Sequence, residues 1–300
     1  MMQKNTKIDE AQGRESVTEC QIKVSVIVPV FNQGKFLSEA LDSVLRQTYP
    51  YWECVIVNDG SPDNTEEVAR RYLDRDGRFK YLFQQNKGLS SARNAGITNS
   101  GGEYILPLDA DDVIGSTYLE KAIRHFEEFP ETKLVYCKAE LFGEKEGCWD
   151  LDTYDYDRFI WRNCIFCTAM YRRNDYDKTK GYNVNMVHGY EDWDFWLTLI
   201  NKEDVVHCID EVLFYYRIKK VSMHTELTKR SKESLVQLYN NHPEIYDQYK
   251  GNILYYRSEG LEFEEEYREI KERYDGVLES NAYRVGKLLL RPLAWLRKHL

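Results

Sequence analysis

The alternation of two apolar patterns between residues 23 and 112 limits the possible fold more than any other feature of the chain. Short apolar or β-branched runs, which are typical of buried strands, occur at residues 23–31, 51–57, 79–83 and 104–108. Between these runs, apolar residues recur at helical spacing, as Leu37, Leu41 and Val44 do. Because strands that alternate with helices form a mostly parallel sheet with helices on its faces, we predict an α/β fold with a Rossmann-like sheet.

Polar residues lie at the ends of three of these expected strands. Residues 29–32 end the first, Asp59 follows the second and residues 109–112 follow the fourth. The carboxyl ends of parallel strands meet at one edge of the sheet, so we expect these polar ends to form one ligand site. Pro29 has no N–H to donate, and we expect pairing of the first strand to stop there.

The sequence L-D-A-D-D places three carboxylates at the end of the fourth expected strand. Asp109 and Asp111 are separated only by Ala110, and Asp112 follows directly. Clustered carboxylates repel one another unless a proton or a cation lies between them. A hard divalent ion, Mg²⁺ or Mn²⁺, shared with substrate phosphates would satisfy them. The alternative is an acidic loop that caps a helix beginning near Ser116.

A second acidic cluster lies at the start of an expected aromatic helix near residue 191. Its members are Glu191, Asp192 and Asp194. Carboxylates favour the amino ends of helices through the helix dipole, which gives the cluster a structural explanation. The functional alternative is a general base beside the first acidic cluster. We also expect a helix at 116–129, strands at 133–142 and 205–216, and a mobile loop at 144–157.

Charge and motif content exclude several classes of protein. The formal net charge of −9 argues against nucleic-acid binding. The chain has neither a G-x-G-x-x-G nor a P-loop motif, so a nucleotide would be held by metal and side chains. Cys164 and Cys167 form a C-x-x-C with no second pair, which favours reduced thiols over a zinc site. Without a signal-like or membrane-spanning apolar run, we expect a cytoplasmic protein.

The two ends of the chain differ from its centre. We expect residues 1–21 to form a flexible polar tail and residues 226–300 to form a helical extension. Residues 285–300 form a basic amphipathic segment that carries Trp295. Such a segment suits the surface of an anionic membrane, docking on the protein's own surface, or the seam of a homodimer.

Five motifs occur in order between Val24 and about Ile200. They are V-S-V-I-V-P-V-F-N, V-I-V-N-D-G-S-P-D-N-T, N-K-G-L-S-S-A-R-N-A-G, L-D-A-D-D and G-Y-E-D-W-D-F-W. Together they resemble the family 2 glycosyltransferases of the GT-A fold. The resemblance implies a GT-A domain over residues 22–225, followed by the C-terminal helical extension. It also implies a nucleotide-diphosphate-sugar donor, a divalent metal and an inverting reaction.

The resemblance also implies roles for individual residues. The expected donor-binding residues are Pro29, Val30, Phe31, Asn32, Asp59, Lys87, Arg93, Asp109 and Ala110. Of these, Asp59 matches the residue that pairs with the nucleotide base. Asp111 and Asp109 match the metal site for Mn²⁺ or Mg²⁺, which His224 would complete only if it folds back towards Asp111. Glu191 and Asp192 match the catalytic pair, in which Asp192 is the general base.

The expected reaction is the transfer of one sugar, because the Q-x-x-R-W motif of processive members of the family is absent. UDP-sugar is the expected donor. A glycan or a lipid-linked glycan at the cytoplasmic face is the expected acceptor, in surface polysaccharide or glycolipid assembly. Two alternatives stay open at this point: a metal-dependent nucleotidyltransferase, and a non-catalytic nucleotide-sugar-binding protein of the same fold.

Overall fold

The structure is a computed structural model that describes residues 24–149, 151–219 and 233–247. The chain divides after Asn241 into two compact units, and the described part of the second contains one short helix, α9 (Pro243–Tyr246). The predictions for residues 1–21, His224 and residues 285–300 lie outside the described residues. No helix in the ranges just given is long and apolar enough to cross a membrane.

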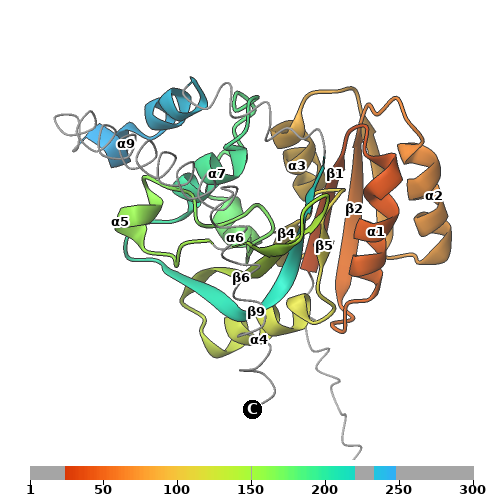
Figure 1. Cartoon of the computed structure of the whole chain (residues 1–300), viewed down its shortest axis with the longest axis horizontal. Helices are drawn as coiled ribbons and strands as arrows, with labels where there is room; N and C mark the ends of the chain where they lie inside the picture. The colour runs from red at the N-terminus through yellow and green to blue at the C-terminus, as the bar shows by residue number, and fades with distance from the viewer. Residues whose placement is uncertain (1–23, 150, 220–232, 248–300) are drawn as a thin grey trace, which may run out of the picture. The chain divides into compact units, whose positions relative to one another are not determined.

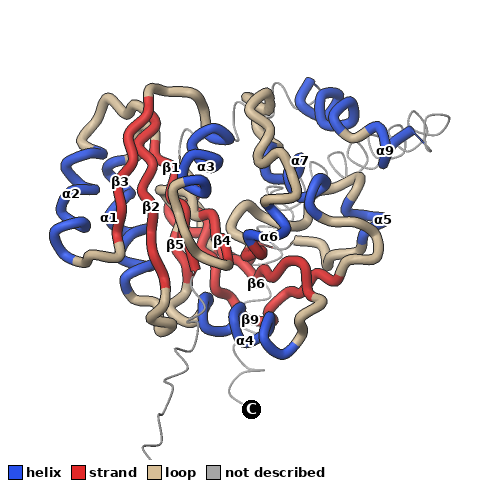
Figure 2. Tube along the Cα trace, turned by 180° about the vertical axis from the view of Figure 1, so that it is seen from behind, coloured by secondary structure: helices blue, strands red, loops and turns tan. Residues whose placement is uncertain are grey.

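Four parallel strands form the first half of the sheet in the first unit. They are β1 (Val24–Val30), β2 (Trp52–Asp59), β3 (Phe79–Gln84) and β4 (Tyr104–Pro107), in the spatial order β3-β2-β1-β4. The connecting helices are α1 (Gly34–Leu45), α2 (Thr65–Arg75) and α3 (Leu89–Thr98). Figures 1 and 2 show α1 and α3 on opposite faces of the sheet. The predicted alternation of strand and helix is confirmed.

The second half of the sheet mixes strand directions. Its strands are β5 (Val113–Ile114), β6 (Thr132–Gly143), β7 (Gly147–Trp149), β8 (Met170–Arg172) and β9 (Val205–Ile218). The helices here are α4 (Tyr118–Glu128), α5 (Tyr156–Phe159), α6 (Arg173–Tyr176) and α7 (Glu191–Leu199). The long β6 and β9 pair in parallel, whereas the short β5, β7 and β8 pair antiparallel to their neighbours. The result is the predicted α/β sheet, mostly parallel by length.

Two expectations from the sequence were wrong in detail. The segment 144–157 is not all loop, because it contains β7 and the first residues of α5. Pairing of β1 does not stop at Pro29, since the register with β2 continues through Pro29 and Val30. On the β4 side the register ends at Ile27, two residues before the proline. The N–H of Val24 donates to Tyr51 on the β2 side, and donors alternate between the two sides of a strand. The N–H that Pro29 lacks would therefore face the β4 side, where the pairing of β1 has already ended.

Helix α3 lies unusually close to the sheet. Ala92 and Ile97 are fully buried against it. A Cβ atom at Gly96 would lie 2.5 Å from Cγ2 of Ile27 and 2.9 Å from Cγ2 of Val57, which no real side chain tolerates. Glycine at this position thus lets α3 approach β1 and β2. Arg93 lies one turn earlier in the same helix, so the close approach also contributes to its burial.

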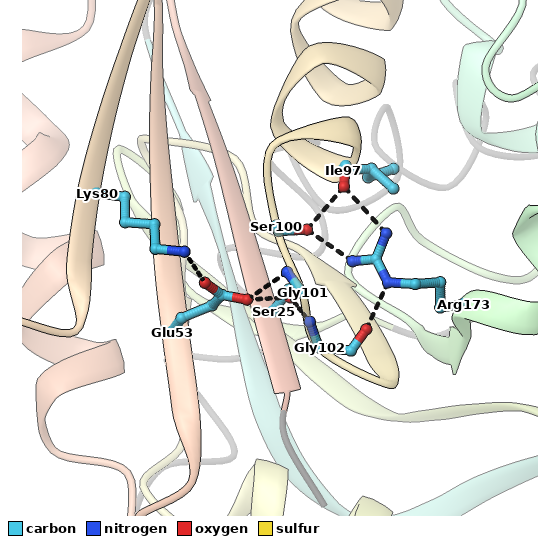
Figure 3. A network of polar contacts seen from close by, with 8 residues as sticks. All are labelled: Ser25, Glu53, Lys80, Ile97, Ser100, Gly101, Gly102 and Arg173. Atoms are coloured by element: carbon cyan, nitrogen blue, oxygen red, sulfur yellow. Dashed lines mark hydrogen bonds and ion pairs between the residues drawn. The ribbon is translucent and has the colours of Figure 1, made fainter.

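A buried carboxylate ties the amino ends of the strands together (Figure 3). Oε1 of Glu53 accepts hydrogen bonds from Ser25 Oγ at 2.9 Å and from the Gly101 backbone N–H at 2.7 Å. Its Oε2 pairs with Nζ of Lys80 at 2.6 Å, and Glu53 itself is only 2% exposed. This network joins β1, β2, β3 and the turn before β4 at the end of the sheet opposite Asp59.

Replacing Glu53 with Ala tests this network. The substitution leaves a buried hydroxyl, a backbone N–H and an ammonium without their acceptor, so we expect the free energy of unfolding to fall by about 2–4 kcal/mol. Urea unfolding followed by circular dichroism measures it. Glu66→Ala, which removes an exposed pair with Arg70, is the control and should change stability by less than about 1 kcal/mol. Equal losses in the two variants would contradict the assigned role.

Candidate active site

The carboxyl ends of β1, β2 and β4 meet at one edge of the sheet, as the sequence predicted. Val30 is in register with Asn58 of β2, and Ile27 is in register with Pro107 of β4. The chain proceeds from β1 to β2 and β3 on one side and returns to β4 on the other, so the strand order reverses between β1 and β4. Open α/β sheets bind their ligands outside the strand ends at such a reversal.

Asp59 organises the turn that leads into α3. Its Oδ1 accepts from the Lys87 backbone N–H at 2.9 Å and from Gln84 Nε2 at 2.7 Å, and its Oδ2 accepts from the Gly88 N–H at 2.9 Å. Gly88 has a positive φ of 88°, a conformation that glycine adopts without strain. Oδ2 accepts one hydrogen bond from the described residues, and a carboxylate oxygen can accept a second. The Lys87 side chain is exposed.

The end of β1 changes abruptly from buried to open. Pro29 and Val30 are buried, whereas Phe31 is 48% exposed. Asn32 adopts a positive φ of 54°, and its backbone N–H donates to Ser61 Oγ at 3.1 Å. A non-glycine residue in this region is uncommon, and such strain often lies next to ligand sites.

The acidic residues after β4 are each held by a different partner. The ammonium of Lys219 pairs with Oδ2 of Asp111. The backbone N–H of Arg217 donates to Oδ1 of Asp112 at 2.8 Å, and Nε of Arg217 donates to the Asp111 carbonyl at 2.8 Å. Ala110, which separates Asp109 from Asp111, is 2% exposed. The end of β9 therefore delivers both cationic residues to the acidic turn.

Asp112 is the most deeply buried of these carboxylates, at 1% exposed. Its Oδ2 has no hydrogen-bond partner among the described residues. Burial, followed by the charges of Asp111 and Asp109, raises the pKa of Asp112 well above its ordinary value. Burial of this kind favours the neutral form of the carboxyl over the ionised form.

Arg93 connects the acidic turn to α7. Its side chain is completely buried, with Nη2 donating to Asp109 Oδ1 at 2.7 Å and Nη1 donating to Glu191 Oε1 at 2.8 Å. Burial alone would lower the pKa of Arg93, but the charges of Asp109 and Glu191 outweigh it and raise the pKa. The ring of Tyr182 lies 5.4 Å from the guanidinium carbon. The two acidic clusters of the sequence thus form one site.

Asp192 follows Glu191 in the chain but is not paired with Arg93. It is half-buried, and its Oδ1 accepts from the Trp193 N–H at 2.7 Å. Burial, followed by the charge of Glu191, raises the pKa of Asp192 to about 7, although Arg93 opposes the shift. A carboxylate with this pKa exchanges a proton near neutral pH, which suits a general base.

The acidic residues at the start of α7 do not serve as a helix cap. The N-cap residue of the helix is Tyr190, which makes no capping side-chain bond and has a positive φ of 60°. Glu191 binds Arg93, and Asp194 accepts from Asn241 Nδ2 at 2.6 Å. The structural explanation for the cluster, that its carboxylates only cap the helix, therefore does not hold for Glu191.

The described residues suit a metal ion that is held partly by the substrate better than a metal site made entirely of protein side chains. No group of three or more His, Cys, Asp or Glu side chains suited to hold a metal occurs in residues 24–149, 151–219 and 233–247. Asp111 is nevertheless a hard, partly exposed carboxylate that already holds a cation, the Lys219 ammonium. Hard divalent ions commonly use one or two carboxylates and complete their shell with substrate phosphates and water.

The structure adds site residues that the sequence did not single out. Cys167 is buried with its Sγ 3.5 Å from Asp109 Oδ2, and Tyr182 lies beside Arg93. Arg217 and Lys219 end a strand far from the acidic turn in sequence. The available sequence signal for Arg217 and Lys219 was that basic residues follow directly after a predicted strand. Nothing in the sequence around Cys167 indicated that it lies beside Asp109.

Comparison with known proteins agrees with this geometry. The sequence model of Glycosyl transferase family 2 matches residues 25–180. The uncharacterized glycosyltransferase EpsJ of Bacillus subtilis is 30% identical over 255 residues, which cover 79% of this chain and 71% of EpsJ. The glycosyltransferase GlyA of Streptococcus pneumoniae is 39% identical over 125 residues, which cover 42% of this chain but only 18% of GlyA.

Solved structures share the fold at low sequence identity. TarS of S. aureus, crystallised with UDP-GlcNAc, superposes with a TM-score of 0.59 at 23% identity, covering 68% of this chain and 61% of that one. The mannosyltransferase PcManGT of Pyrobaculum calidifontis, in complex with GDP-Man and Mn²⁺, gives a TM-score of 0.55 at 19% identity, covering 72% and 63% of the two chains. The chain therefore belongs to glycosyltransferase family 2 and is a glycosyltransferase with the GT-A fold.

Proposed function

We propose that this enzyme transfers one sugar from a nucleotide-diphosphate sugar, a UDP-sugar, to an acceptor hydroxyl with inversion at the anomeric carbon. The observation that carries the proposal is Asp192, a half-buried carboxylate whose pKa is raised to about 7 next to the acidic turn after β4. Membership of the glycosyltransferase family favours this reaction over nucleotidyl transfer and over sugar binding without turnover.

The donor would bind across the carboxyl ends of β1, β2 and β4. Asp59 has capacity to accept a hydrogen bond from the base, and residues 29–32 would form the wall of its pocket. Lys87, whose backbone N–H binds Asp59 and whose side chain is exposed, would contact the donor, whereas the buried Arg93 would act indirectly by holding Asp109. TarS and PcManGT, which bind UDP-GlcNAc and GDP-Man, support a nucleotide sugar as the donor.

A divalent ion, Mn²⁺ or Mg²⁺, would be held by Asp111, with Asp109 and His224 as the further expected ligands. When bound, it would neutralise the negative charge that develops on the leaving diphosphate. Asp109 is paired with the fully buried Arg93, whereas Asp111 is paired with the partly exposed Lys219, so Asp111 is the stronger candidate of the two carboxylates. The Mn²⁺ bound to PcManGT supports a metal in this fold.

Asp192 would remove the proton from the acceptor hydroxyl while the acceptor oxygen attacks the anomeric carbon. The new carbon–oxygen bond forms on the face opposite the diphosphate, which leaves with the electron pair of the broken bond. Glu191 and Asp109 are both held by Arg93 and would not compete as nucleophiles. A single base without a covalent intermediate gives inversion of configuration.

The acceptor would be a glycan or a lipid-linked glycan in surface polysaccharide or glycolipid assembly. Support comes from the sequence, in which residues 285–300 are basic and amphipathic and suit an anionic membrane surface. The enzyme would then act at the cytoplasmic face of the membrane as a peripheral protein. The same segment would serve as a dimer seam if the protein does not bind lipid.

Asp192→Asn tests the base. We expect nucleotide release from the donor sugar to fall at least about 100-fold, because the amide cannot take a proton, while donor binding persists. The donor is first identified by a thermal-shift screen of nucleotide sugars with Mn²⁺. The control is Asp194→Asn, a neighbouring carboxylate of the same helix turn that binds Asn241, and it should keep most of its activity. Near-normal turnover in Asp192→Asn would show that another group is the base.

Arg93→Lys tests the electrostatic link between the two clusters. Activity should rise with pH through about 7 in the wild type, because Asp192 must be deprotonated to act. A lysine carries the same charge but cannot bridge Asp109 and Glu191, so the charge of Glu191 beside Asp192 is balanced less well and the midpoint of the pH–rate profile should move to higher pH. The control is Arg173→Lys, whose guanidinium binds Gly102 and Ser100 instead. A folded Arg93→Lys enzyme with an unshifted profile would refute the link.

Asp111→Asn and metal removal test the metal site together. Treatment with EDTA should abolish nucleotide release and added Mn²⁺ should restore it, whereas Asp111→Asn should respond only to a much higher Mn²⁺ concentration. Titration of Mn²⁺ against activity measures both effects. Full activity after thorough chelation would remove the metal, and Asp111 with it, from the reaction.

A further inference from the structure

The acidic turn after β4 is neutralised by the protein's own cations. Asp109 pairs with Arg93, and Asp111 pairs with Lys219. A divalent ion that binds Asp111 must therefore replace an ammonium that is already there. This feature cannot be read from the D-x-D motif, because Lys219 lies 108 residues after Asp111 in the sequence.

The two cations at the end of β9 differ in how firmly they are held. Arg217 donates from Nε to the Asp111 carbonyl at 2.8 Å and from Nη2 to Glu39 at 2.7 Å, and its guanidinium lies 4.2 Å from the ring centre of Phe142. It is therefore part of the packing of the turn. The ammonium of Lys219 has Asp111 as its ion-pair partner, with the ring of Phe36 at 5.8 Å.

Lys219 is thus able to leave Asp111 without breaking the turn. Both side chains are partly exposed, at 17% for Lys219 and 18% for Asp111. A lysine ammonium is a point charge on a flexible four-carbon stem, so it can change partners over several ångströms at little cost. Its departure would leave the Arg217 bonds and the backbone of the turn in place.

We propose that Lys219 is a tethered counter-ion of the donor site. It occupies Asp111 in the metal-free enzyme, gives up this carboxylate to the divalent ion, and then pairs with the diphosphate that arrives with the metal. This inference rests on the proposed function, in which Asp111 holds the metal. Lys219 acts on the reaction by controlling when Asp111 is open to the metal and by stabilising the anion afterwards.

The exchange has a thermodynamic consequence. Metal alone must displace the ammonium and leave it without an anion, so metal alone binds weakly. Metal and nucleotide diphosphate together give the ammonium a new partner, so each tightens the binding of the other. Lys219 therefore makes metal and nucleotide bind cooperatively, and it limits binding of free divalent ions to the empty site.

The test is calorimetric titration of Mn²⁺ into the full-length protein, with and without UDP. In Lys219→Gln the competitor is gone, so Mn²⁺ alone should bind about five- to tenfold more tightly than to the wild type. The gain in Mn²⁺ affinity that UDP produces should shrink in the same variant. The control is Lys138→Gln, which removes a lysine paired with Asp210 on the neighbouring strand and should leave both values unchanged.

Chemical labelling gives a second measurement that does not depend on affinity. Acetylation of lysines followed by mass spectrometry should show Lys219 becoming more reactive when Mn²⁺ is added and protected again when UDP follows. Lys138 should react equally under all three conditions. These outcomes require an ammonium that moves, whereas a lysine that only repels the metal through space would keep a constant reactivity.

Two contrary results are distinguishable. If Mn²⁺ binding is lost in Asp111→Asn but unchanged in Lys219→Gln, the metal site stands and the counter-ion role of Lys219 is refuted. If Asp111→Asn binds Mn²⁺ as the wild type does, the metal assignment of the proposed function fails and this inference fails with it. Unchanged labelling of Lys219 on addition of Mn²⁺ would also refute the exchange.

Discussion

The buried guanidinium of Arg93 holds together segments that the chain places far apart. It donates to Asp109 at the end of β4 and to Glu191 at the start of α7, 98 residues after Arg93 itself. A fully buried charge is stable only when it is paired and hydrogen-bonded, so removing either carboxylate would leave an uncompensated cation in the core. The same pairing occupies two of three neighbouring carboxylates and leaves Asp192 with the raised pKa. Stability and chemistry thus depend on one set of contacts.

A cation from the end of β9 completes the balance of charge. The ammonium of Lys219 pairs with Asp111, whereas Arg217 binds the Asp112 carboxyl through its backbone N–H and the Asp111 carbonyl through Nε. Strain accompanies this arrangement, because Asn32 and Tyr190 have positive φ and lie at the two ends of the site, after β1 and before α7. Such conformations persist where the surrounding contacts determine them fully, which is typical of ligand sites.

The sequence predicted the β1–β4 half of the sheet because each element there has a local pattern of its own. Buried β-branched runs such as that of β1 and the helical spacing of α1 are visible without tertiary information. The strands β7 and β8 were not predicted, because each has only three residues and its pairing is decided by its neighbours rather than by its composition. The acidic residues of the site could be predicted from local motifs, but the partners of Asp111 could not, because Lys219 is brought to it by the long β6–β9 pair. The role of Arg93 was predicted as nucleotide binding, whereas its complete burial favours a role in holding the two acidic clusters together.

The proposed mechanism depends on Asp192 exchanging a proton near neutral pH, well above the range of an ordinary aspartate. The most direct measurement is the pKa of Asp192 itself, from the pH dependence of its ¹³C carboxyl resonance by NMR, assigned with Asp192→Asn. A midpoint of about 7 is expected for Asp192, because burial and the charge of Glu191 disfavour its ionised form. A midpoint near 4, the ordinary value for an aspartate, would contradict the account.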